Sequence, residues 1–150
     1  MTSPLDPDAA RPATGRPLAL LLIGVGGTIG TLLRFTLEAV HPAAPGTWPT
    51  TTFLINVSGA FLLAVLLEGI SLLGPDDGWR RRVRLGVGTG VLGGFTTYSA
   101  FMVEAAQLGR SAEYLIAVAY VALTVLLGTA AAWAGIAAVN ALHRGKHGAQ

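Results

Sequence analysis

The stretch Gly93-Gly94-Phe95-Thr96-Thr97-Tyr98-Ser99-Ala100-Phe101 decides the fold, because it lies in the middle of an otherwise apolar block of the chain. Two adjacent glycines weaken a helix by roughly 1 kcal/mol each relative to alanine, and two β-branched threonines follow them directly. A helix interrupted inside a bilayer frees backbone carbonyls, which is tolerated only where a ligand or a hydrated cavity satisfies them. Interrupted membrane helices can hold Na⁺ with such carbonyls. The alternative is a continuous, closely packed helix whose hydroxyls bond to its own backbone.

The composition around this stretch indicates a membrane protein. Of the 150 residues, 52% are hydrophobic and only 12% are charged, and the mean hydropathy is +0.59. An ordinary soluble domain has about 25% charged residues, so this class and the coiled coil are excluded. The chain has no cysteine, which excludes disulfides and thiol chemistry. No nucleophile–base arrangement is visible, and we therefore expect no enzyme.

Four apolar blocks are long enough to cross a hydrocarbon core, which takes about 20 residues. They cover about residues 18–40, 50–73, 83–108 and 112–142. Residues 1–17 are expected to form a disordered tail, and residues 143–150 a basic one. The sequence thus predicts an all-α membrane protein with four transmembrane helices, the third broken at its centre.

The basic residues are distributed unevenly between the two sides of this bundle. Eight of the ten flank the side that carries both termini, namely Arg11, Arg16, Arg80, Arg81, Arg82, Arg84, Arg144 and Lys146. Only Arg34 and Arg110 belong to the other side. Cytoplasmic loops carry an excess of Lys and Arg, so both termini are predicted to be cytoplasmic in the plasma membrane.

Polar residues inside the predicted spans are the candidates for function, since lipid makes them costly. Asn56 lies near the middle of the second span, one turn after Thr52. Its amide could serve an anion or form an interhelical hydrogen bond, and both remain open. In the fourth span Tyr120, Thr124 and Gly128 recur every four residues, which favours a structural stripe.

Arg34 and Glu104 are charged residues near membrane depth, and either could extend to an interface from the end of a span. Glycines also recur every four residues, at Gly26 and Gly30 and at Gly86, Gly90 and Gly94. This spacing suits close helix contact in lipid. A nucleotide fingerprint would need a preceding strand, which the sequence does not predict.

Three segments, taken in order, resemble the signatures of the Fluc/CrcB family of fluoride channels. The first is GGTIGTLLR at 26–34, and the second combines Pro49 and Thr52 with NVSGAFL at 56–62. The third and most specific is GGFTTYSAF at 93–101. Their order and spacing extend the resemblance over about residues 18–142.

The resemblance implies an antiparallel dimer with two narrow fluoride pathways and one central, non-transported Na⁺. Carbonyls of Gly93 and Thr96 from both subunits would hold the Na⁺, with Arg34 and Glu104 in supporting positions. The expected fluoride pathway involves Asn56, Thr97, Tyr98, Ser99, Phe101 and Thr124. The implied function is passive export of cytoplasmic fluoride, which reduces its toxicity.

The chain departs from the family pattern at Tyr98, where Phe is usual, and at Ala100, where Thr is usual. The charge bias further predicts pairing with a paralogue of reversed bias, as an alternative to an antiparallel homodimer. Two other functions compete. A small multidrug-type, proton-coupled exporter needs a carboxylate within its first span, where this chain has Arg34 and, at the far end, Glu38. A non-conducting assembly subunit explains the glycines but not Asn56.

Overall fold

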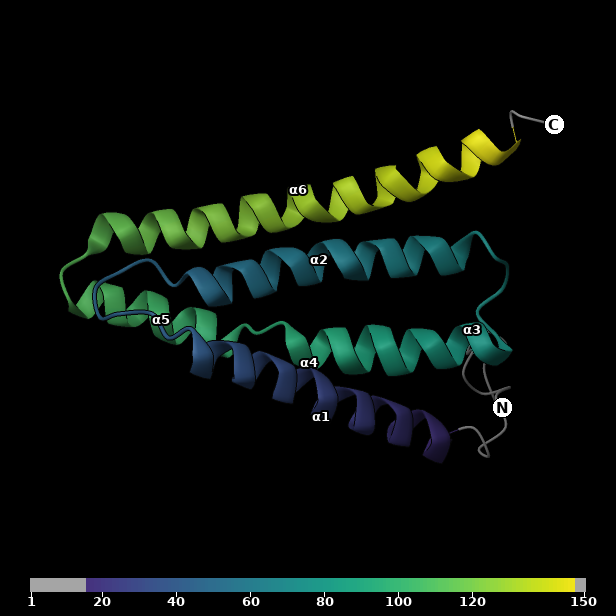
Figure 1. Ribbon diagram of the computed structural model, residues 1–150, viewed down its shortest axis with the longest axis horizontal. Helices are drawn as coiled ribbons and strands as arrows, with labels where there is room; N and C mark the ends of the chain where they lie inside the picture. The colour runs from purple at the N-terminus through teal and green to yellow at the C-terminus, as the bar shows by residue number, and fades with distance from the viewer. Residues whose placement is uncertain (1–15, 148–150) are drawn as a thin grey trace, which may run out of the picture.

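The computed structural model describes residues 16–147, and its regular elements there are all helices (Figure 1). They are α1 (Arg16–Val40), α2 (Thr50–Ser71), α3 (Gly78–Val83), the π-helix η2 (Arg84–Leu92), α4 (Gly93–Phe95), α5 (Ser99–Arg110) and α6 (Tyr114–His147). The all-helical prediction is confirmed. Most of the predicted N-terminal tail, residues 1–15, lies outside the described part. At the other end, α6 continues past residue 142, where the sequence placed the end of the last span.

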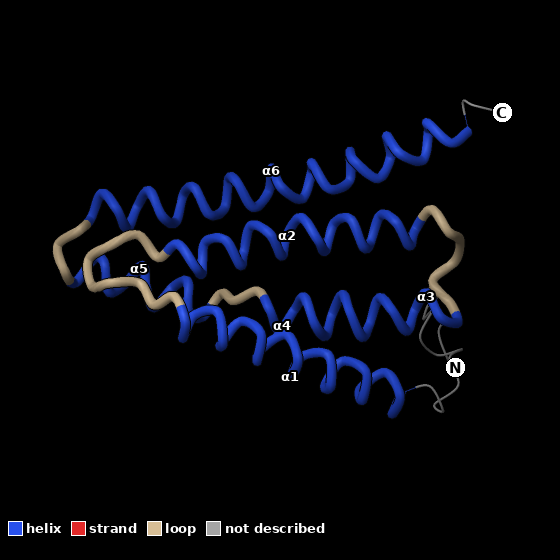
Figure 2. Tube along the Cα trace, in the orientation of Figure 1, coloured by secondary structure: helices blue, strands red, loops and turns tan. Residues whose placement is uncertain are grey.

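Three of these helices are long and apolar enough to cross a membrane by length and composition: α1, α2 and α6 up to Gly145. The predicted span at about 83–108 is instead a succession of shorter segments, in which α3, η2 and α4 follow one another without a gap. Residues 96–98 then separate α4 from α5, visible as a tan loop in Figure 2. This succession lies alongside α1 and α2 (Figures 1 and 2), and together with α6 the described elements form a bundle of four helical rods.

The rods associate mainly as two pairs. Helix α6 packs along α2, and α1 packs along η2 and α4, while α5 also contacts α6. The first residue of α1, the last of α6 and the short α3 lie at the same end of the bundle (Figure 1). The loop at 41–49 and the turn at 111–113 lie at the other end (Figure 2). This arrangement puts the interruption between α4 and α5 beside the middle of α1 and α2.

Glycines let α1 and η2 approach until their backbones touch. A methyl group added at Gly26 would collide with the carbonyl of Gly86, and one at Gly90 would lie 2.9 Å from the Cα of Gly26. A methyl group at Gly94 would collide in the same way with the carbonyl of Gly27. The prediction that the four-residue glycine spacing serves helix packing is therefore confirmed. The π-helical form of η2 was not predicted, because a hydrophobic pattern does not distinguish it from an α-helix.

Candidate functional site

Residues 96–98 form the connection between α4 and α5, and the side chains of two threonines form hydrogen bonds to the backbone on either side of it. Thr96 closes α4: its backbone N–H and its Oγ1 both donate to the Leu92 carbonyl, each at 3.0 Å, and its own backbone is extended, with φ −75° and ψ 156°. Thr97 precedes α5, and its Oγ1 accepts a hydrogen bond from the backbone N–H of Ala100, in the first turn of that helix, at 3.1 Å. Such side-chain bonds compete with the helical ladder, which explains why the threonines stand here.

Asn56 of α2 binds the backbone of this connection with both ends of its amide. Its Nδ2 donates to the Thr97 carbonyl at 2.9 Å, and its Oδ1 accepts the Thr97 N–H at 2.8 Å. The sequence left open whether Asn56 forms a hydrogen bond to another segment of the bundle. The structure shows two such bonds, both to Thr97. Since a primary amide has two N–H groups, one remains beyond these contacts. The predicted role of Asn56 toward an anion depends on that hydrogen.

The two carbonyls predicted to hold Na⁺ lose their usual helical donors in this geometry. In a continuous α-helix the Thr97 N–H would donate to Gly93 and the Ala100 N–H to Thr96. Here the first donates to Asn56 and the second to the Thr97 hydroxyl. Within residues 16–147, no group of three or more His, Asp or Glu side chains could hold a metal ion. Backbone carbonyl oxygens such as those of Gly93 and Thr96 are hard ligands of the kind that hard cations prefer.

Arg34 of α1 reaches the same region from the opposite side of the connection. Its Nε approaches the Gly94 carbonyl at 3.5 Å, and the Thr31 hydroxyl approaches this oxygen at 3.4 Å. Its Nη1 pairs with Glu38 Oε2 at 3.1 Å. The side chain therefore turns toward the bundle rather than extending to an interface. Glu38, the one carboxylate in the sequence of α1, is held in this ion pair near the end of the helix, unlike the mid-helix carboxylate of a proton-coupled exporter.

Glu104 of α5 lies at the centre of a polar cluster that the sequence analysis did not assemble. Its two oxygens accept hydrogen bonds from the hydroxyls of Thr52 and Tyr120, both at 2.7 Å. Both donors are buried, with exposed fractions of 1% and 0%. The three residues come from three different helices, and Thr52 is 52 residues away from Glu104 along the chain, so local spacing could not bring the three together. The sequence offered one signal for this cluster: a charged residue such as Glu104 is costly inside a membrane span and therefore needs polar partners there.

The two aromatic residues predicted for the pathway lie in different surroundings. Phe101 is buried, and its ring centroid is 5.1 Å from that of Tyr120. Tyr98 is 76% exposed, and its ring centroid is 6.3 Å from that of Phe101. Trp48, in the loop before α2, packs edge-on against Tyr120 at 5.5 Å. One member of the aromatic pair is thus fixed within the subunit, and the other faces outward.

The predicted hydroxyl donors are partly engaged with their own helices. Thr124 Oγ1 donates to the Tyr120 carbonyl at 2.6 Å, and its side chain is buried. The hydroxyls of Thr97 and Ser99 lie 3.3 Å apart, and either could be the donor. The geometry brings Thr97, Tyr98, Ser99 and Asn56 together at the connection. Thr124 belongs to the neighbouring cluster around Tyr120.

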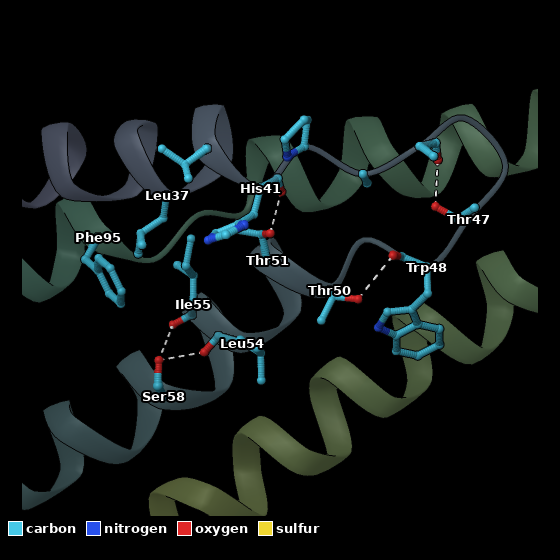
Figure 3. A pocket seen from close by; sticks show the side chains of 14 residues that line it. Leu37, His41, Thr47, Trp48, Thr50, Thr51, Leu54, Ile55, Ser58 and Phe95 are labelled. Atoms are coloured by element: carbon cyan, nitrogen blue, oxygen red, sulfur yellow. Dashed lines mark hydrogen bonds between the residues drawn. The ribbon is translucent and has the colours of Figure 1, made fainter.

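A separate groove of about 720 Å³ opens between the end of α1 and the start of α2 (Figure 3). Its labelled residues include Leu37, Leu54, Ile55 and Phe95, which make it mainly apolar, and also His41. Its hydroxyls all donate to nearby backbone carbonyls, as the dashed lines in Figure 3 show; they belong to Thr47, Thr50, Thr51 and Ser58. This groove offers few polar donors to an ion, and the candidate site is the α4–α5 connection instead.

Comparisons with a family model and with individual known proteins point to the same family. Residues 21–136 match the family model described as CrcB-like protein, Camphor Resistance (CrcB). The chain is 47% identical over 125 residues to "Fluoride-specific ion channel FluC 1" of Cutibacterium acnes, covering 83% of this chain and 87% of that protein. It is 50% identical over 119 residues to "Fluoride-specific ion channel FluC 2" of Leifsonia xyli subsp. xyli, covering 79% and 81%. A "Fluoride-specific ion channel FluC" of Chlorobium luteolum is 38% identical over 128 residues, covering 83% and 94%.

Proposed function

This chain belongs to the CrcB family, and on that premise we propose that it is a fluoride-selective, passive ion channel that exports cytoplasmic fluoride. The observation that carries the proposal is the binding of the Thr97 backbone by Asn56. It joins a donor-bearing amide to the non-helical connection between α4 and α5, in a protein whose relatives are named fluoride channels. Fluoride enters acid-exposed cells as neutral HF and ionises inside, so a channel driven by membrane potential is enough to expel it.

The residues at the connection suit a small, strongly hydrated anion. A low-dielectric path must replace the water around fluoride with hydrogen-bond donors. The remaining N–H of Asn56, the hydroxyls of Thr97 and Ser99 and the positive ring edges of Tyr98 and Phe101 are such donors. None of them is a fixed cation that would trap the ion. Conduction requires binding that is strong enough for entry and weak enough for release.

A structural Na⁺ fits the chemistry of the carbonyls freed at the connection. Hard cations favour oxygen ligands, and the Gly93 and Thr96 oxygens are released by the diversion of two backbone N–H groups. Each subunit would contribute this pair of oxygens, so two subunits together would complete the coordination. When bound, the ion would supply positive potential beside the anion pathway. Arg34 and Glu104 would support the site by fixing α1 and α5 around it.

An antiparallel dimer is supported by the outward-facing Tyr98. Its exposed ring lies next to the buried Phe101, so the aromatic pair would be completed by the surface of a second subunit. The charge bias of eight to two supports a cytoplasmic location for both termini. Opposed copies of one chain need nearly balanced flanking charge, which this chain lacks. A paralogue of reversed bias is therefore the proposed partner.

The test is fluoride efflux from liposomes that contain the purified chain, compared with chloride and repeated without Na⁺. We expect fluoride efflux with little chloride efflux when the protein can form its dimer, and slower efflux without Na⁺. Absence of fluoride efflux both from the chain alone and from the chain with a paralogue would refute the channel. Robust efflux from the chain alone would refute an obligatory partner while leaving the channel intact.

A further inference from the structure

The four arginines that begin the interrupted rod divide into two pairs with different partners. Arg80 donates to Asp77 at 2.6 Å, and Arg84 donates to both oxygens of Asp76, at 3.0 and 2.6 Å. These two charges are therefore compensated. Arg81 and Arg82 have no acidic partner among the described residues. The structure thus leaves two adjacent positive charges uncompensated at one end of the bundle.

Both uncompensated arginines line the same small cavity. Its volume is about 180 Å³, and its other walls are Leu18, Ala19 and Leu22 of α1, Gly78 of α3 and Leu85 of η2. Positive charge stands at one side and aliphatic side chains at the other. A free anion would interact with the arginines but not with the leucines, and a purely apolar molecule would contact the leucines but leave the arginines without a partner.

The level of this cavity along the bundle matches a membrane–water interface. Trp79 lies next to the arginines and is 55% exposed, and Trp is enriched where one end of a side chain meets lipid and the other meets water. The first turns of the apolar helix α1 begin at Arg16, so Leu18 and Leu22 mark the start of the hydrocarbon-facing surface. A ligand here would have its charged part beside the arginines and its chain along α1.

We propose that this cavity, formed by Arg81, Arg82, Leu18, Leu22 and Leu85, binds an anionic phospholipid. The lipid phosphate would lie against the two guanidinium groups, which recognise phosphate oxygens with charge-assisted hydrogen bonds. The upper part of an acyl chain would lie along the leucines. Clusters of basic residues beside membrane spans bind acidic headgroups in this way. The inference rests on the membrane location of the chain and is independent of fluoride conduction.

The test is native mass spectrometry of the purified full chain with phosphatidylglycerol or phosphatidylcholine of the same acyl chains. We expect phosphatidylglycerol to be retained in preference to phosphatidylcholine. The double variant Arg81→Gln, Arg82→Gln should lower phosphatidylglycerol retention roughly tenfold. The matched control is Arg144→Gln, Lys146→Gln, which removes two charges near the end of α6, at the same end of the bundle, and should retain the lipid within about twofold.

A second variant keeps the charges and changes the apolar wall. Leu18→Gln should also lower lipid retention, and inorganic phosphate at millimolar concentration should not displace the lipid. Equal losses in the two double variants would overturn the proposal, since general surface electrostatics would then explain binding. Displacement by inorganic phosphate, or equal retention of the two lipids by the unmodified protein, would also overturn it. Because lipid retention is measured without ion flux, these results are separate from the outcome of the efflux assay.

Discussion

Replacement of Asn56 by Leu should stop fluoride efflux. The change leaves the N–H and the carbonyl of Thr97, now bonded at 2.8 and 2.9 Å, without their partners. A buried polar group without a partner costs about 1–3 kcal/mol, so the two together cost about 2–6 kcal/mol. The connection between α4 and α5 would then rearrange, and the donor offered to the anion would be lost. The assay is fluoride efflux from liposomes at equal protein content, together with the thermal midpoint in detergent.

Asn140→Leu is the matched control for this experiment. Asn140 of α6 donates to Glu68 Oε1 at 2.8 Å, so the same substitution breaks another partly buried interhelical bond. This pair lies away from the α4–α5 connection and outside the proposed pathway. We expect Asn140→Leu to lower the thermal midpoint while efflux continues. Efflux by Asn56→Leu within about twofold of the control would refute the reasoning, since uniform destabilisation would then account for the result.

Three further outcomes follow from the same contacts. Gly26→Ala should destabilise the bundle by about 1–3 kcal/mol, because the methyl group collides with the carbonyl of Gly86, whereas Gly24→Ala, with nothing within 4 Å, should be neutral or slightly stabilising in the same thermal assay. Tyr120→Phe should cost about 1.5–3 kcal/mol through loss of the hydrogen bond to Glu104; an unchanged thermal midpoint would contradict it. Exchange of Na⁺ for a bulky organic cation should slow efflux and weaken the dimer in size-exclusion chromatography, and identical behaviour in both salts would exclude the structural ion.

The general fold could be predicted because hydrophobic length and glycine spacing act locally. The second span was expected at about 50–73, and α2 covers Thr50–Ser71. The four-residue repeat that contains Gly26 predicted a close contact, and its added Cβ would indeed meet the partner helix. Both inferences use only neighbours along one helix. Predicting the division of the third span into η2, α4 and α5 would have required knowing which side chains form hydrogen bonds to its backbone in place of the helical ones.

The candidate site was predictable residue by residue but not as a network. Asn56 stood out because a polar amide in a span needs a partner, yet nothing in the sequence identified Thr97 as that partner. Thr52, Glu104 and Tyr120 come together only after α2, α5 and α6 have packed. For Glu104, the sequence left open whether the side chain extends to an interface from the end of its span. Two buried hydroxyl donors hold it inside the bundle instead, which offsets the cost of placing a carboxylate there.

The hydrogen-bond inventory of the connection argues that one subunit alone is an incomplete pathway. Thr96 Oγ1 is committed to Leu92, and Thr97 Oγ1 accepts from Ala100. Of these two side chains, Thr97 both stabilises the interruption and belongs to the expected fluoride pathway. A single chain still offers the second amide hydrogen of Asn56, one hydroxyl hydrogen of the Thr97–Ser99 pair and the exposed ring of Tyr98. Since fluoride requires several donors to replace its water, we expect further donors to come from a second subunit. If a cross-linked dimer conducted no better than protein held monomeric in dilute detergent and then reconstituted, this requirement would be wrong.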